Sequence, residues 1–160
     1  MIESLDWKGI VLHHSETTDS GTQDWSGIRK YHMEVKGWRD IGYHFGIEVA
    51  DGQIVLQKGR SLTIPGAHCK GLNHTHLGIC MVGNYNTHTL ETDKSIILIN
   101  LLDELITEFS IKINDIIGHW ESYIILGQAS SQIEAQKIKT CPGLMFDMPA
   151  LRLKLMEHIL

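Results

Sequence analysis

The chain has 160 residues, of which 42% are hydrophobic and 21% charged, and this composition is typical of one soluble globular domain. A disordered, collagen-like or multi-domain chain is excluded. Fourteen basic and nineteen acidic residues give a net charge of -5 with no basic run, so the electrostatic footprint of a nucleic-acid-binding protein is missing. The longest strongly apolar stretch, residues 96–102, is far shorter than the roughly 20 residues that span a bilayer, and we expect no membrane insertion.

The numbers of cysteines and histidines indicate the redox compartment of the protein and a candidate metal site. Cys69, Cys80 and Cys141 are scattered and odd in number, which fits a reducing compartment better than a disulfide framework. The segment 1–6 lacks the positive start and apolar stretch of a secretory signal, so we expect no signal peptide and a protein that is cytoplasmic when made. Ten histidines are an unusual number, and they motivate a search for a metal site because imidazole is the commonest metal ligand.

Short apolar runs predict the strands of one sheet. Residues 10–12 form a buried strand that ends in polar residues, and the runs 43–49 and 53–56 flank Asp51-Gly52, which favours a tight hairpin turn. Residues 77–83 and 115–119 are further apolar runs of strand length. Parallel and hairpin connections together predict a mixed sheet.

Helical patterns separate these strands. The first helix is predicted from Trp25 to Val35, with Thr22 or Asp24 as its N-cap and Gly37 as its stop. The other helices are predicted over residues 92–109 with Thr92 as cap, from a capping box at Ser131 and Glu134 to about Lys139, and over residues 147–158. We therefore predict an α/β fold, a single domain over residues 1–160 with a central mixed β-sheet flanked by helices.

Three residues distant in sequence have the chemistry of a metal centre. His13 and His119 each end an apolar run, and Cys141 lies in a Cys-Pro-Gly turn that a structural cysteine rarely occupies. Two imidazoles and a thiolate suit zinc, and three protein ligands leave a fourth position for water, as in catalytic sites. The spacing alone is a weak signal, because no local metal-binding motif links the three residues.

Several sequence blocks occur in one order along most of the chain. They are Ile10-Val11-Leu12-His13-His14-Ser15, Gly37-Trp38-Arg39-Asp40-Ile41-Gly42-Tyr43-His44-Phe45, Gly66-Ala67-His68-Cys69-Lys70-Gly71-Leu72-Asn73, Leu77-Gly78-Ile79-Cys80, Gly118-His119 and Lys139-Thr140-Cys141-Pro142-Gly143. Together these blocks resemble the zinc-dependent N-acetylmuramoyl-L-alanine amidases, a superfamily that includes amidase-type phage lysozymes and peptidoglycan recognition proteins. The resemblance runs collinearly from about Lys8 to Gly143 and implies a peptidoglycan recognition protein-like fold.

Residue by residue, the resemblance implies that zinc is held by three ligands and that two further residues are catalytic. The implied zinc ligands are His13, His119 and Cys141, and the implied catalytic residues are Tyr43 and Lys139. His14 remains the alternative to His13, because a strand buried on both faces does not reveal which neighbour faces the site.

Other residues receive weaker assignments. His68 lies in a loop that borders the cleft in this family, so we expect a substrate contact or a proton-transfer role. Glu121 is a candidate hydrogen-bond partner for a ligand imidazole. The segment 120–140 is longer than is usual in better known members, and it forms either a lid, a substrate wall or an exposed insertion.

The resemblance implies a hydrolase that cleaves the amide between the lactyl group of N-acetylmuramic acid and L-alanine in peptidoglycan, as a phage-type endolysin or bacterial autolysin does. Its partner is then peptidoglycan or a muropeptide, reached in the cell wall after release, and we expect a monomer with no nucleic-acid partner. The alternatives are a non-catalytic peptidoglycan-binding receptor and a protein-binding regulator. Cys141 favours the enzyme, because relatives without turnover commonly lack this cysteine.

Overall fold

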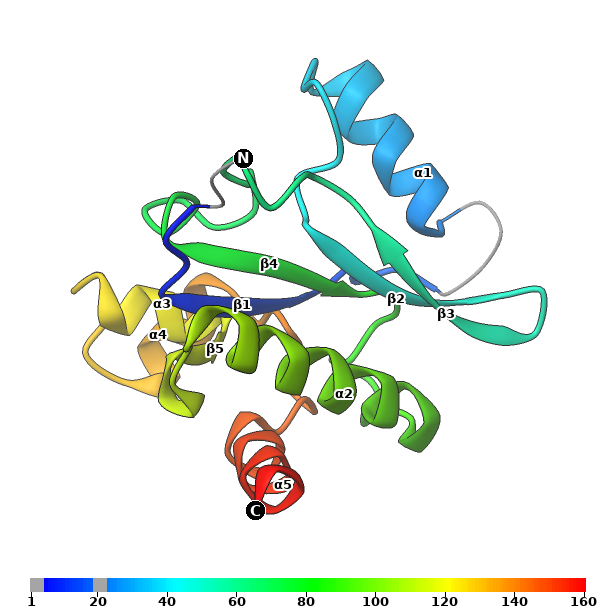
Figure 1. The fold of residues 1–160 in the computed structure, drawn as a ribbon. Helices are drawn as coiled ribbons and strands as arrows, with labels where there is room; N and C mark the ends of the chain where they lie inside the picture. Colours follow the sequence, from blue (N-terminus) through cyan, green and yellow to red (C-terminus); the bar gives the residue numbers. More distant parts are fainter. Residues whose placement is uncertain (1–4, 19–22) are drawn as a thin grey trace.

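The fold is built on one mixed sheet of five strands in the order β3-β2-β4-β1-β5, as seen in the computed structural model, which describes residues 5–18 and 23–160 (Figure 1). β2 and β3 are antiparallel, and the other neighbouring strands are parallel. This arrangement confirms the predicted α/β domain with a central mixed sheet. The strands are β1 (Gly9–His14), β2 (Phe45–Ala50), β3 (Gln53–Lys58), β4 (His76–Met81) and β5 (Ile116–Gly118).

Helices cover the sheet unequally. Figure 1 shows α2 and α5 on one side of the sheet and α1 on the other, while α3 and α4 lie beside β5 at the edge. None of the helices in residues 5–18 and 23–160 is long and apolar enough to cross a membrane. The helical elements are α1 (Trp25–Lys30), a π-helical segment η1 (Tyr31–Val35), α2 (Thr92–Phe109), a 3-10 turn η2 (Ile113–Asp115), α3 (His119–Ile125), α4 (Gln132–Ile138) and α5 (Met148–Ile159).

The main hydrophobic core lies between the sheet and the helices α2 and α5. Alternate residues of β1 and β4 point into it, because successive side chains of a strand face opposite sides of the sheet. Its fully buried members from the sheet include Ile10, Leu12, Leu77, Ile79 and Met81. This side of the molecule therefore supplies most of the apolar burial that stabilises the fold.

The opposite face of the sheet has only small apolar clusters. Val11 and Ile117 pack with Leu72 and Cys69, and Trp25 packs with Ile41 and Cys80. Gly46 makes the second packing possible, since a Cβ atom there would lie 2.3 Å from the Trp25 ring. The space between these clusters contains the polar residues of the site.

The predicted hairpin and first helix are confirmed with changes in detail. Asp51 and Gly52 both have positive φ, at 51° and 73°, as a tight turn between β2 and β3 requires. The first helix covers the predicted range as α1 followed by η1. The Asp24 carboxylate caps it by accepting a hydrogen bond from the Gly27 N–H at 2.9 Å, and the alternative cap Thr22 lies outside the described residues.

The later helices differ from the predictions in one cap, one capping box and one additional helix. Glu91 is the N-cap position of α2 and Thr92 is already helical, so the predicted Thr92 cap is wrong. Ser131 caps α4 as predicted, but the Glu134 carboxylate accepts from Ser130, so the predicted capping box is not closed. Helix α3 was not predicted, because its seven residues are too few to give a clear apolar period.

Candidate active site and metal centre

The three candidate ligands converge at one edge of the sheet. His13 lies near the carboxyl end of β1, and His119 directly follows the neighbouring parallel strand β5, in which Gly118 pairs with Leu12. Carboxyl ends of parallel strands meet at the same edge, where α/β proteins place their sites. Cys141 reaches this edge from the turn between α4 and α5, and the potential ligand atoms of the three side chains lie within 4.8 Å of one another.

Cys141 is held close to the first strand. Its Sγ lies 3.6 Å from Nδ1 of His13 and accepts a hydrogen bond from the His14 backbone N–H at 3.4 Å. Burial raises the pKa of the Cys141 thiol to about 12. Without a cation the sulfur is therefore protonated at neutral pH, and a bound metal ion is the group that would stabilise its thiolate.

The two candidate imidazoles are neutral at pH 7. Burial, with a smaller contribution from the Lys139 ammonium, lowers the pKa of His119 to about 4, and burial with the neighbouring His119 lowers the pKa of His13 well below its ordinary value. The His119 ring stacks on Tyr123, and its Nδ1 is buried without a hydrogen-bond partner among the described residues. Neutral imidazoles with a free nitrogen are the form that binds a metal.

His14 points to the other side of β1. Its Nδ1 accepts a hydrogen bond from the Tyr85 backbone N–H at 3.0 Å, and His14 is not part of the His13, His119 and Cys141 group. In the geometry of this site His13, not His14, is the strand histidine that faces the other two.

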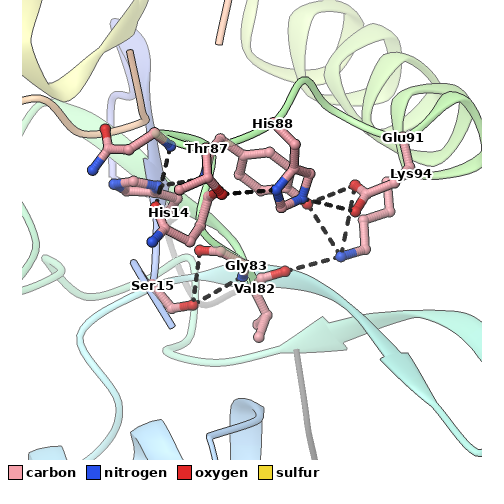
Figure 2. A network of polar contacts seen from close by, with 11 residues as sticks. His14, Ser15, Val82, Gly83, Thr87, His88, Glu91 and Lys94 are labelled. Atoms are coloured by element: carbon pink, nitrogen blue, oxygen red, sulfur yellow. Dashed lines mark hydrogen bonds and ion pairs between the residues drawn. The ribbon is translucent and has the colours of Figure 1, made fainter. Parts of the chain in front are cut away.

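A polar network that includes the buried Lys94 lies on the same side of the sheet as His14 (Figure 2). The Lys94 side chain is only 2% exposed, and its ammonium donates to the Val82 carbonyl at 2.9 Å and to the Tyr85 hydroxyl at 3.1 Å. The Tyr85 hydroxyl in turn donates to Glu91 at 2.8 Å. Because the Tyr85 carbonyl accepts from the Met145 N–H at 2.8 Å, this network also anchors the turn that contains Cys141.

Tyr43 and Lys139 line the same cavity of about 260 Å³ as the three candidate ligands. The Tyr43 ring lies 5.2 Å from the His13 ring and packs against the cluster that contains Trp25 and Cys80. Burial raises the pKa of Tyr43 well above its ordinary value, so the hydroxyl keeps its proton and can act as a donor. The exposed Lys139 is the residue directly after α4.

The segment 120–140 forms the helices α3 and α4, which pack against each other. His119 begins α3 and Lys139 follows α4, so the two helices connect two residues that line the cavity. Of residues 120–140, only Lys139 lines the cavity, so the choice between a lid, a substrate wall and an exposed insertion stays a prediction.

Comparison of the sequence with known proteins identifies the family of the chain. The sequence profile of N-acetylmuramoyl-L-alanine amidases matches residues 3–144. The chain belongs to this amidase family. The chain is 42% identical over 81 residues to the endolysin of Escherichia phage T7 and 39% identical over 85 residues to peptidoglycan-recognition protein SC2 of Drosophila melanogaster. These matches cover 51% and 50% of this chain and 50% and 45% of the two relatives, so the chain spans about half the length of the curated relatives it matches.

Solved structures of amidases share the fold. The amidase LysC from Clostridium intestinale superposes with a TM-score of 0.70 at 28% identity, covering 94% of this chain and 86% of that one. Bumblebee PGRP-SA superposes with a TM-score of 0.64 at 24% identity, covering 91% and 82%, which is a likeness of fold. The predicted peptidoglycan recognition protein-like architecture is confirmed.

One weaker prediction for this amidase-family chain is wrong. The Glu121 carboxylate does not contact a ligand imidazole. It accepts from the Gly118 N–H at 3.0 Å at the start of α3 and forms an ion pair with Arg152 at 3.0 Å. It therefore orients the residue before His119 rather than the imidazole itself.

The structure also adds residues that the sequence did not single out for the amidase site. Lys36 and Glu16 line the cavity beside the candidate ligands, and Cys80 belongs to the apolar cluster against which Tyr43 packs. Cys80 lies within an apolar strand, and such a pattern by itself indicates only packing in the core. Its pairing in register with His13 on the neighbouring strand is the signal that could have placed it near the site.

Proposed function

We propose that the chain is a zinc-dependent hydrolase that cleaves the amide between the lactyl group of N-acetylmuramic acid and L-alanine in peptidoglycan. The observation that carries the proposal is the convergence of two imidazoles and one thiol on a cavity that also contains Tyr43 and Lys139. Membership of the amidase family supports the same reaction.

The residues present fit a zinc ion. Two nitrogen donors and one sulfur donor are a set that zinc prefers, with a fourth position left for water. The 3.6 Å between Cys141 Sγ and His13 Nδ1 is about the separation that bond lengths near 2.3 and 2.0–2.1 Å give two ligands of a tetrahedral ion. The unpartnered Nδ1 of His119 is a buried nitrogen that a metal bond would satisfy.

The chain's own residues supply the remaining chemistry. When bound, zinc provides a water nucleophile that ionises near pH 7 instead of near 15.7. As the amide carbonyl is attacked, negative charge grows on its oxygen, and the Lys139 ammonium and Tyr43 hydroxyl are the nearby donors that can stabilise it. His13 and His119 would hold the ion as neutral imidazoles, because burial opposes their protonation.

A peptidoglycan receptor without turnover is the second candidate, because the relatives include peptidoglycan-recognition proteins. The presence of Cys141 beside both histidines favours the hydrolase. The two candidates differ in whether new amino groups appear on the polymer.

The deciding experiment incubates the zinc-loaded chain with purified peptidoglycan and measures newly exposed L-alanine amino groups. We expect release that stops with a chelator, returns with zinc and is absent in Cys141→Ser. Binding to the polymer without release by the zinc-loaded protein would favour the receptor instead. If neither binding nor release occurred, the proposed substrate would be wrong.

A further inference from the structure

His68 forms the middle of a hydrogen-bond chain that begins at a backbone carbonyl and ends at the candidate metal centre. His68 Nε2 lies 3.0 Å from the His76 carbonyl oxygen, and His68 Nδ1 lies 2.9 Å from His13 Nε2. We infer that His68 is a positioning residue, which uses the His76 carbonyl to fix the tautomer and orientation of His13 so that Nδ1 faces the metal. This inference rests on the proposed function for its metal, but not for its hydrogen bonds.

The direction of each hydrogen bond follows from the carbonyl. A carbonyl oxygen only accepts, so His68 Nε2 carries the proton in that bond. A neutral imidazole has one N–H, which leaves His68 Nδ1 as an acceptor, and His13 Nε2 must then be the donor. His13 Nδ1 is left with its lone pair, and it is the nitrogen that lies 3.6 Å from Cys141 Sγ. One backbone carbonyl thus sets the state of two side chains.

Close packing against two glycines fixes the position of the His68 ring. A Cβ atom at Gly78 would lie 2.5 Å from ring atoms of His68, and a Cβ at Gly66 would also lie 2.5 Å from the ring. No Cβ comes that close to other atoms in real structures, so both positions need glycine for the ring to remain in this place. The Asn73 side chain also accepts from the His68 backbone N–H at 2.8 Å.

Hydrogen bonding distinguishes this role from the substrate contact expected from the sequence. Both ring nitrogens of His68 are already paired within the protein. A substrate bond to either nitrogen would have to break the connection to His13 or to His76. The hydrogen-bond chain therefore assigns His68 to the positioning of His13 rather than to a contact with the substrate.

The first test reads the tautomer directly in the metal-free protein. Nitrogen-15 chemical shifts and two-bond couplings of the imidazoles separate the Nδ1–H from the Nε2–H form. In the unsubstituted chain at neutral pH we expect His13 and His68 both in the Nε2–H form. A His13 ring with its proton on Nδ1 would overturn the inference, whatever the activity of the protein.

The second test compares substitutions of His68. Leu in H68L fills space but accepts no hydrogen bond, whereas Asn in H68N keeps an oxygen near the place of Nδ1. Loss of such a partner of a metal ligand typically weakens metal affinity by about 10–100-fold. We expect a weakening of that size for zinc in H68L, measured by chelator competition, and a smaller one in H68N. The control is H74A, which removes an exposed histidine of the same loop and should leave the affinity unchanged.

The outcomes separate this inference from the proposed function. If the unsubstituted chain bound no zinc, the proposed function would fail, while the tautomer measurement would still decide the hydrogen-bond chain. If zinc bound equally well to the original chain, H68L and H68N, the positioning role would be refuted and the hydrolase proposal would stand. If H68L did not fold, H68N and the tautomer of the original chain would carry the test.

Discussion

Two neighbouring histidines at the end of β1 have different roles on the two sides of the sheet. His13 faces the thinly covered side, where His68, His119 and Cys141 surround it. His14 faces the side of the main core, where it accepts a hydrogen bond from the Tyr85 backbone beside the Lys94 network. Side chains of equal chemistry thus become a candidate metal ligand and a structural acceptor through strand alternation alone.

The difference shows how one strand can join stability to chemistry. The face toward α2 and α5 supplies the apolar burial, and the other face leaves room for a cavity lined by titratable groups. The His14 N–H also contacts Cys141 Sγ, so the structural histidine and the candidate ligand meet through the backbone.

Replacing each histidine in turn has the largest expected effect. We expect His13→Ala to lose zinc and to reduce amidase activity by more than the roughly 10²–10³-fold that loss of a single oxyanion donor costs. His14→Ala should keep the zinc, because its side chain is directed away from the site. Zinc content by elemental analysis and release of L-alanine amino groups measure both. The reverse result would make His14 the ligand.

Replacing Tyr43 separates metal binding from catalysis within the site. In Tyr43→Phe the ring and its contact with His13 remain, but the hydroxyl donor is lost. We expect kcat to fall by about 10²–10³-fold with zinc content unchanged, because only charge stabilisation in the transition state is removed. Steady-state kinetics on soluble muropeptide would measure it, and an unchanged kcat would exclude the hydroxyl from the reaction.

His44 tests whether burial alone makes a histidine neutral in this fold. Burial lowers its pKa to about 4, so between pH 6.5 and 4 the unfolded chain binds a proton that the folded chain does not. The contribution of His44 to the free energy of unfolding is therefore fully present above pH 6.5. It decreases as the pH falls, by up to about 1.4 kcal/mol per pH unit. We expect a correspondingly flatter dependence in metal-free His44→Gln, measured by urea unfolding from pH 4.5 to 7. Equal slopes for the two proteins would mean that His44 titrates normally.

The smallest expected effect is that of Lys94 on the His14 side. Lys94→Met keeps most of the side-chain volume but leaves the Val82 carbonyl without this donor. We expect the free energy of unfolding to decrease by about 1–3 kcal/mol, the usual cost of an unsatisfied buried polar group. Urea unfolding measures the change, and Lys154→Met on an exposed part of α5 is the matched control. An equal change in both variants would show that the buried hydrogen bonds of Lys94 do not stabilise the fold.

The sequence predicted the sheet, most helices and the three candidate ligands that the fold brings together, but not their orientation or the further cavity residues Lys36 and Glu16. Residues 10–12, the hairpin and the long helix α2 have strong periodic patterns, and the family resemblance supplied Tyr43 and Lys139. The choice between His13 and His14 could not be made from alternation, since all six residues of β1 are buried. The partner of His13 was also missed, because a hydrogen bond between residues 13 and 68 depends on how a loop folds over the sheet.

The candidate ligands are separated by most of the chain, at positions 13, 119 and 141. An ion held by them would join the first strand to the region before the last helix, much as a covalent cross-link would. Since only the folded chain brings the three together, the surrounding zinc concentration would become part of the folding equilibrium, adding roughly 2.7 kcal/mol at a hundred times the dissociation constant. A zinc-starved molecule would then be easier for a protease to open and destroy than a loaded one.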